Sequence, residues 1–140
     1  MKQLKITELR KVPKDKIGYL NTNNVILQPN EKTTFKYLTL FGLNIEIIQP
    51  TLTENAKNPD ALIFGIIWEA KTPTRYNPNT IKQRFRTASK QAANVIFDFR
   101  LIKQNSDDAE KCIIAMFEEG RRVRRLIVIE KSGKVLDIRK

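Results

Sequence analysis

The chain has 140 residues, enough for one domain with its own core, and its 41% hydrophobic content is ordinary for a globular protein. It contains no histidine, which excludes histidine general bases and histidine metal ligands, and its single cysteine, Cys112, excludes an internal disulfide. The net charge is +11, from 26 Lys and Arg against 15 Asp and Glu, which favours a polyanionic partner.

The segment 1–29 is expected to be irregular, because Pro13, Gly18 and the polar run 21–24 interrupt any long element. Residues 1–20 are charged throughout and lack the apolar stretch of a secretory signal. We therefore expect a cytoplasmic site of action, either for a separate protein or for one part of a larger delivered protein. No run is long enough to span a bilayer, so no membrane partner is expected.

From residue 30 onward, apolar spacing and capping residues predict alternating helices and strands, in one domain over 30–140. The order predicts an α+β fold, a mixed, largely antiparallel sheet with three helices packed on it. The expected elements are a helix over 30–41 capped by Asn30 and ended at Gly42, a strand over 43–48, a polar loop over 51–58, a hairpin over 60–64 and 66–71, a helix over 79–93 capped by Asn79 or Thr80, a strand over 94–99, a helix over 107–119 capped by Asp107, and a hairpin over 125–130 and 135–138.

The first predicted hairpin carries the most informative residues. Alternation along its second strand places Glu69 and Lys71 on one face and Trp68 on the other, and a tight turn at Gly65 can bring Asp60 beside them. Two carboxylates could hold a divalent metal or act as acid and base, and a lysine could stabilise a developing oxyanion. The pattern suits phosphodiester cleavage, and it equally suits a half-buried hairpin with an exposed Glu/Lys pair.

Basic residues gather next to this hairpin. Between residues 71 and 103 there are eight Lys and Arg and a single acid, Asp98. On the predicted helix over 79–93, one face presents cations at helical spacing and another mixes a cation with uncharged hydrogen bonders, which suits contact with phosphates. The alternative is an ordinary solvated basic face. The candidate phosphate-contacting residues are Lys82, Arg84, Arg86, Thr87, Lys90, Gln91, Arg100 and, after the next helix, Arg121 and Arg122.

Several stretches together resemble the C-terminal tRNA-nuclease domain of contact-dependent growth inhibition toxins of the CdiA type. They read NPDALIFGIIWEAKTP over 58–73, RTASKQ over 86–91, NVIFDFR over 94–100 and GKVLDI over 133–138. The resemblance implies a nuclease fold of the barnase, EndoU, colicin and RelE kind, metal-independent cleavage of RNA, usually tRNA, and neutralisation by an immunity protein. The residues it favours are Asp60, Glu69, Lys71, Lys90 and Gln91 at the catalytic centre, with Thr80, Arg86 and Asp98 around them.

A second resemblance is to the PD-(D/E)xK nucleases, carried by Pro59-Asp60 and Glu69-Ala70-Lys71. It implies a Mg²⁺-dependent DNA nuclease in which Asp60 and Glu69 bind the metal, whereas the first resemblance implies no cofactor. A third interpretation, which needs only the basic surface, is a non-catalytic nucleic-acid-binding module.

A protein partner is also expected. A free nuclease would harm the cell that makes it, so the toxin resemblance implies a protein inhibitor. We expect this immunity protein to be acidic and to cover the basic surface that contains Arg84, Arg86, Lys90 and residues 121–125.

Overall fold

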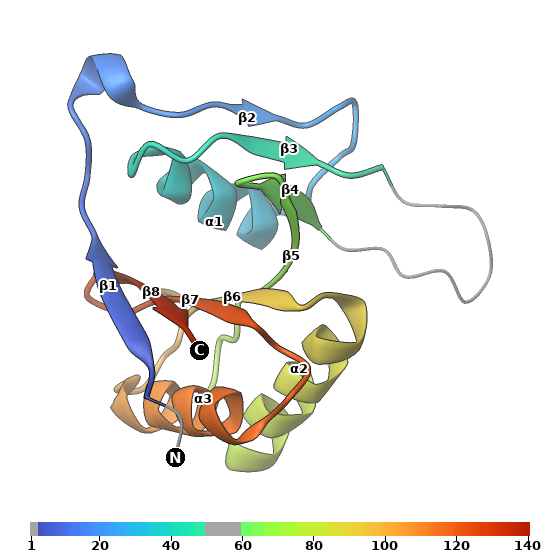
Figure 1. The fold of residues 1–140 in the computed structure, drawn as a ribbon, viewed down its shortest axis with the longest axis vertical. Helices are drawn as coiled ribbons and strands as arrows, with labels where there is room; N and C mark the ends of the chain where they lie inside the picture. The colour runs from blue at the N-terminus through green and yellow to red at the C-terminus, as the bar shows by residue number, and fades with distance from the viewer. Residues whose placement is uncertain (1–2, 50–59) are drawn as a thin grey trace.

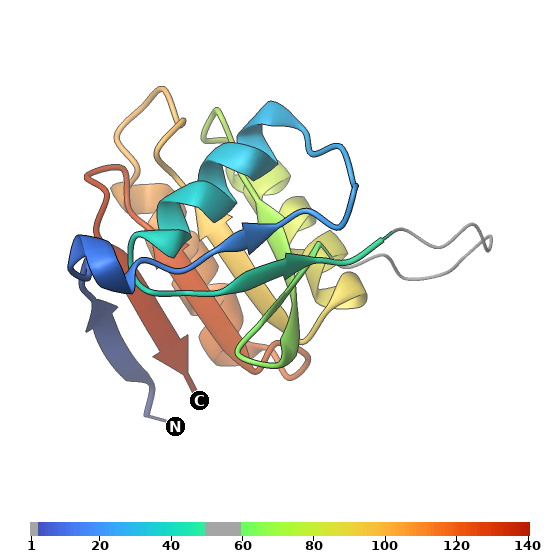
Figure 2. The same cartoon turned by 90° about the horizontal axis from the view of Figure 1, so that it is seen from above.

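The computed structural model describes residues 3–49 and 60–140; the loop predicted over 51–58 lies outside these ranges. One eight-stranded mixed sheet, in the order β1-β8-β7-β6-β5-β4-β3-β2, carries helices on both faces (Figures 1 and 2). This confirms the predicted α+β fold with three α-helices. The elements are β1 (Lys5–Leu9), a 3-10 turn η1 (Lys14–Lys16), β2 (Leu20–Asn21), α1 (Pro29–Thr39), β3 (Ile45–Ile47), β4 (Ala61–Ile63), β5 (Ile66–Lys71), α2 (Pro78–Gln91), β6 (Asn94–Asp98), α3 (Asp107–Glu119), β7 (Arg125–Ile129) and β8 (Val135–Arg139).

The central strands β5, β6 and β7 are parallel, while β4 pairs antiparallel with both β3 and β5. Helix α2 makes the crossover from β5 to β6, as a parallel pair requires. It therefore begins at the end of β5 and ends at the start of β6 (Figure 1). This arrangement separates the two ends of β5 into two different environments.

Strand β6 is buried on both faces, as expected for a central parallel strand covered by helices. Val95 and Phe97 belong to the core under α2 and α3, and Ile96 belongs to the core under α1. Trp68 lies fully buried in the α1 core, on the face opposite Glu69 and Lys71, as the alternation predicts.

The N-terminal segment differs from the prediction, because residues 3–29 include two strands of the sheet rather than only irregular chain. β1 pairs antiparallel with β8, and β2 pairs parallel with β3. Both strands are short and β1 is largely exposed, so their sequences lack the periodic burial that predicts a strand. Long-range pairing at the sheet edges forms them.

The predicted helix caps are shifted by one or two residues. Gln28 and Ser106 occupy the N-cap positions two residues and one residue before the predicted caps, and Asn77 lies two residues before the nearer of its two predicted caps. Proline at the first helical position of α1 and α2 accounts for two of these shifts, since its fixed φ suits N1. The predicted tight turn is confirmed, because Phe64 and Gly65 have φ of 57° and 76°, as a two-residue hairpin requires.

Candidate active site

The hairpin of β4 and β5 brings Asp60 and Glu69 together, as the sequence predicts. Asp60 lies just before β4, and its Oδ2 accepts a hydrogen bond of 2.8 Å from the Ala70 backbone N–H. Its backbone N–H donates to the Trp68 carbonyl at 3.0 Å. These two bonds fix the Asp60 carboxyl against the end of β5, where it interacts electrostatically with Glu69.

Lys71 completes the predicted group. Its Nζ lies 3.2 Å from Glu69 Oε1, and both side chains point to the α2 side of the sheet. The other carboxylate oxygen, Glu69 Oε2, is buried and has no hydrogen-bond partner within residues 3–49 and 60–140. A buried carboxylate oxygen without a partner costs free energy on folding. It therefore marks a position where a hydrogen-bond donor or a cation of a ligand would be stabilised.

The two carboxyl groups have unusual acidities. Burial, followed by the charge of Glu69, raises the pKa of Asp60 to about 7, although the Ala70 amide acts in the opposite direction. Burial also raises the pKa of Glu69, while Lys71 opposes that shift. Near neutral pH the pair therefore holds a proton that two exposed carboxylates would have lost. Such a pair can both donate and accept a proton at the pH of a cell.

Glu31 on α1 is a member of this site that the sequence analysis missed. Its carboxylate acts electrostatically on both Asp60 and Glu69 and contributes to their raised pKa values. Its Oε1 also accepts a hydrogen bond of 3.0 Å from the Gln28 backbone N–H, so the helix N-terminus fixes its position. In a sequence, an acid at the third helical position indicates a capping residue. That local role gives no sign that Glu31 also lies near Asp60 and Glu69.

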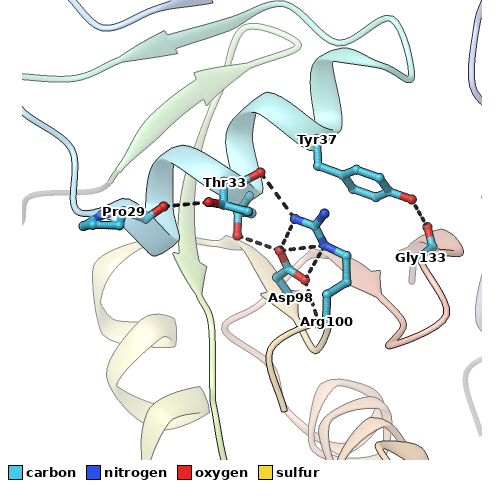
Figure 3. Close-up of polar contacts among 7 residues, drawn as sticks. Pro29, Thr33, Tyr37, Asp98, Arg100 and Gly133 are labelled. Atoms are coloured by element: carbon cyan, nitrogen blue, oxygen red, sulfur yellow. Dashed lines mark hydrogen bonds and ion pairs between the residues drawn. The ribbon is translucent and has the colours of Figure 1, made fainter. Parts of the chain in front are cut away.

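Asp98 and Arg100 hold α1 to the end of β6 (Figure 3). Asp98 is only 1% exposed, and it accepts hydrogen bonds from Thr34 Oγ1 at 2.7 Å and from Arg100 Nη2 at 2.8 Å. The Arg100 guanidinium also lies 3.9 Å from the centre of the Tyr37 ring. The structure thus gives both predicted substrate-binding residues an internal role, which keeps α1, and with it Glu31, in place.

The remaining predicted residues lie along α2 and beyond it. Thr80, Lys82, Arg84, Arg86 and Thr87 are exposed on α2. Lys90 and Gln91 lie at the end of α2, where they line a hollow with the start of β5, away from Lys71 at the other end of that strand. Arg122 lines the same hollow, and Arg121 lines the next one.

The first amides of α2 are already used within the helix. Asn77 Oδ1 accepts hydrogen bonds from the Asn79 and Thr80 N–H groups at 3.0 and 3.3 Å. A phosphate at this terminus would have to displace the Asn77 cap.

The carboxylates of the site limit how a metal ion could bind. In the described ranges, no group of three or more His, Cys, Asp or Glu side chains is arranged to hold a metal ion. Asp60 and Glu69 nevertheless interact closely, and Mg²⁺ often uses only one or two carboxylates together with water and phosphate oxygens. The two carboxylates, with the unpartnered Glu69 Oε2, fit such a limited role.

Among the helices described, none is long and apolar enough to cross a membrane.

Comparison with known proteins gives two matches and one negative result. The family model described as contact-dependent growth inhibition CdiA C-terminal domain matches residues 57–135. A solved structure, the CdiA-CT/CdiI toxin and immunity complex from Burkholderia pseudomallei, has a similar fold with a TM-score of 0.66. It is 20% identical, over 86% of this chain and 98% of that chain. No curated protein matches. The family match spans more than half of the chain and includes Asp60, Glu69 and Lys71, so the chain belongs to the contact-dependent growth inhibition CdiA C-terminal domain family.

Proposed function

We propose that this domain is a nuclease toxin that cleaves RNA, with tRNA as the substrate to test first. The observation that carries the proposal is the pair of interacting carboxyl groups, Asp60 and Glu69, with Lys71 at 3.2 Å from one of them. The net charge of +11 supports a polyanionic substrate. Membership of a growth-inhibition family supports a toxic activity.

The chemistry follows from the protonation of the pair. One carboxylate removes the proton of a ribose 2′-hydroxyl, whose oxygen then attacks the adjacent phosphorus. The 5′-oxygen leaves with a proton from the second carboxyl group, and the products are a 2′,3′-cyclic phosphate and a 5′-hydroxyl. Lys71 stabilises the negative charge on the phosphorane-like oxygens. The carboxyl pair and Lys71 thus supply a base, an acid and a cation without histidine.

A divalent cation is the second candidate, and one observation favours it. Glu31 brings a third carboxylate into electrostatic contact with Asp60 and Glu69, which costs free energy that a bound cation would offset. Asp60 and Glu69 would then be its ligands, and the cation would polarise the phosphate of RNA or, in the PD-(D/E)xK manner, of DNA. Lys71 would keep its role beside the scissile phosphate.

The test uses purified protein with total tRNA and, separately, plasmid DNA, each in excess EDTA and in Mg²⁺. The acid–base route predicts tRNA cleavage that persists in EDTA and produces 2′,3′-cyclic ends. Cleavage lost in EDTA and restored by Mg²⁺ supports the cation route instead. Intact tRNA and DNA under all conditions, with a folded protein, would leave only the binding-module interpretation.

An acidic immunity protein is the partner we propose. The solved structure with the similar fold is described as a toxin and immunity complex, and this chain exposes Arg84, Arg86 and Lys90 on one helix. Complementary charge would speed its association, so the association rate should fall as salt rises. Expression of the chain without a partner should arrest growth, and normal growth with intact tRNA would contradict the toxin proposal.

A further inference from the structure

A second concave surface lies at the beginning of β5, away from Lys71. Its volume is about 1090 Å³, and its walls come from the β4–β5 turn, the end of α2 and the start of β6. Ile67, which is 43% exposed, and Ala93 provide apolar surface. Lys90 and Arg122 provide positive charge at the same hollow. Apolar surface beside cations suits a flat apolar ring joined to a phosphate.

The loop after α3 presents further cations beside this hollow in a fixed arrangement. Val123 is 1% exposed and anchors the loop in the core, while Arg121, Arg122 and Arg124 on either side of it are exposed. The Arg124 backbone N–H also donates to the Ala93 carbonyl at 2.6 Å. Within the described residues, no ion pair joins these three arginines to an acid, so their charge is available to a ligand.

A second basic hollow continues from the first. Asn94 lines both, and the second, of about 670 Å³, is also lined by Arg121, Arg124, Arg139 and Lys140. The two hollows together form a basic track at this end of the sheet. A strand's rise of about 3.3 Å per residue separates Ile67 from Lys71 by about 13 Å, so the track is distinct from the carboxyl pair but within reach of one folded RNA.

We propose that this hollow is a second RNA-binding site, in which an unstacked base rests against Ile67 and Ala93 while Lys90 and Arg122 hold the flanking phosphates. The inference rests on the proposed function and deepens it, since the substrate becomes an RNA that engages both ends of β5. A concave surface with an apolar wall fits an extruded base better than it fits a flat protein face, and proteins recognise single-stranded parts of RNA through bases that are splayed out of the stack.

The experiment compares two substitutions that test the two parts of the site. Arg122→Glu reverses one charge, and Ile67→Ala removes exposed apolar surface from the hollow without changing the charge. Lys14→Glu, on the exposed turn η1, is the matched charge-reversal control. Steady-state cleavage of tRNA and of a dinucleotide is measured, and the binding of tRNA is followed by fluorescence anisotropy over a range of salt.

We expect both substitutions at the hollow to raise the KM for tRNA at least about fivefold, with kcat within twofold, because a phosphate contact and a base packed on apolar surface each contribute about this much. Cleavage of a dinucleotide, whose single phosphate must occupy the catalytic centre, should not change. Arg122→Glu should also reduce the salt dependence of binding, and Lys14→Glu should change neither KM nor that dependence.

Two results would overturn the inference. One is a KM for tRNA within twofold of the unsubstituted protein in both variants. The other is loss of binding to an acidic protein inhibitor with no change in RNA affinity, which would make the surface a protein interface. If the chain cleaves no RNA, the proposed function fails separately. Anisotropy then still decides this inference, because equal tRNA binding by all variants would refute it.

Discussion

Thr34 Oγ1 donates a hydrogen bond of 2.7 Å to Asp98 Oδ2, and this bond joins two residues 64 positions apart in the sequence. Both side chains are buried. Thr34 follows Glu31 by three positions on α1, and Asp98 ends β6, so the bond fixes the helix that carries Glu31 to the sheet that carries Glu69. The orientation of the third carboxylate at the site thus depends on a contact outside the site.

Thr34→Val should therefore lower the free energy of unfolding by about 1–2 kcal/mol, because it keeps the shape and removes one hydrogen bond to a buried charge. Thr33→Val is the matched control, since Thr33 is exposed and its hydroxyl donates to the Pro29 carbonyl of its own helix. The substitution also keeps the Thr33 backbone carbonyl, which accepts a hydrogen bond from Arg100. Urea unfolding followed by tryptophan fluorescence measures both. Equal losses in the two variants would show that the Thr34–Asp98 bond contributes nothing particular.

Arg100→Ala should destabilise the protein by about 3 kcal/mol, because it leaves Asp98 buried without its cation. The double variant Arg100→Ala/Asp98→Ala should lose less than the sum of the two single losses, since neither charge then remains unpaired. A double-mutant cycle in urea measures this difference. Additive losses would mean that the 2.8 Å ion pair carries no net coupling free energy.

Asp60→Asn should stabilise the protein at high pH. A carboxyl group whose pKa is raised from 3.8 to about 7 by burial prefers its neutral form in the folded state, so its contribution to stability is complete below pH 3.8 and is lost as the pH rises through 7. We expect a gain of about 1–2 kcal/mol at pH 8 and little change at pH 4. Thermal unfolding across this range measures it, with the exposed Asp15→Asn as control. A gain that is the same at pH 4 and pH 8 would contradict the assignment.

Glu69→Gln should separate activity from stability. We expect RNA cleavage to fall by at least about 100-fold, because the variant loses a proton-transferring group. The fold should be unchanged or more stable, because the substitution removes a buried charge whose Oε2 has no partner among the described residues. Cleavage assays and melting curves test this, with Glu118→Gln on the exposed side of α3 as the comparison. Loss of activity with a matching loss of stability would point to a structural role for Glu69.

The hairpin shows how far local pattern reaches. Alternation along 66–71 predicts that Glu69 and Lys71 share a face, and their 3.2 Å contact follows from that period. A tight turn at Gly65 brings Asp60 back beside β5, where its carboxylate accepts a hydrogen bond from the Ala70 N–H, so two acids and a lysine could be grouped without a structure. The burial that raises the pKa of both acids could not be predicted, because it depends on elements distant in the sequence.

Lys90 and Asp98 show what local pattern leaves open. Helical spacing groups Lys90 with other cations of α2, but only the direction of the crossover helix shows that it lies at the start of β5, away from Lys71. Strand alternation correctly places Asp98 on the face opposite Val95 and Phe97. The sequence does not show that Thr34 of α1 donates a hydrogen bond to Asp98 on that face. Periodicity gives the face of a residue and says nothing of what packs against that face.

The amino-acid sequence by itself determined the charge, the absence of histidine chemistry, the α+β order of elements and the grouping of Asp60, Glu69 and Lys71, because each depends on composition or on neighbours a few residues apart. The tertiary structure alone decided that Glu31 joins them, that residues 5–9 and 20–21 become strands, and that Arg122 and Ile67 share a hollow. These features require segments far apart in the chain to pack on one sheet. The free energy that favours this packing comes from contacts between distant residues, so no short stretch of sequence predicts it.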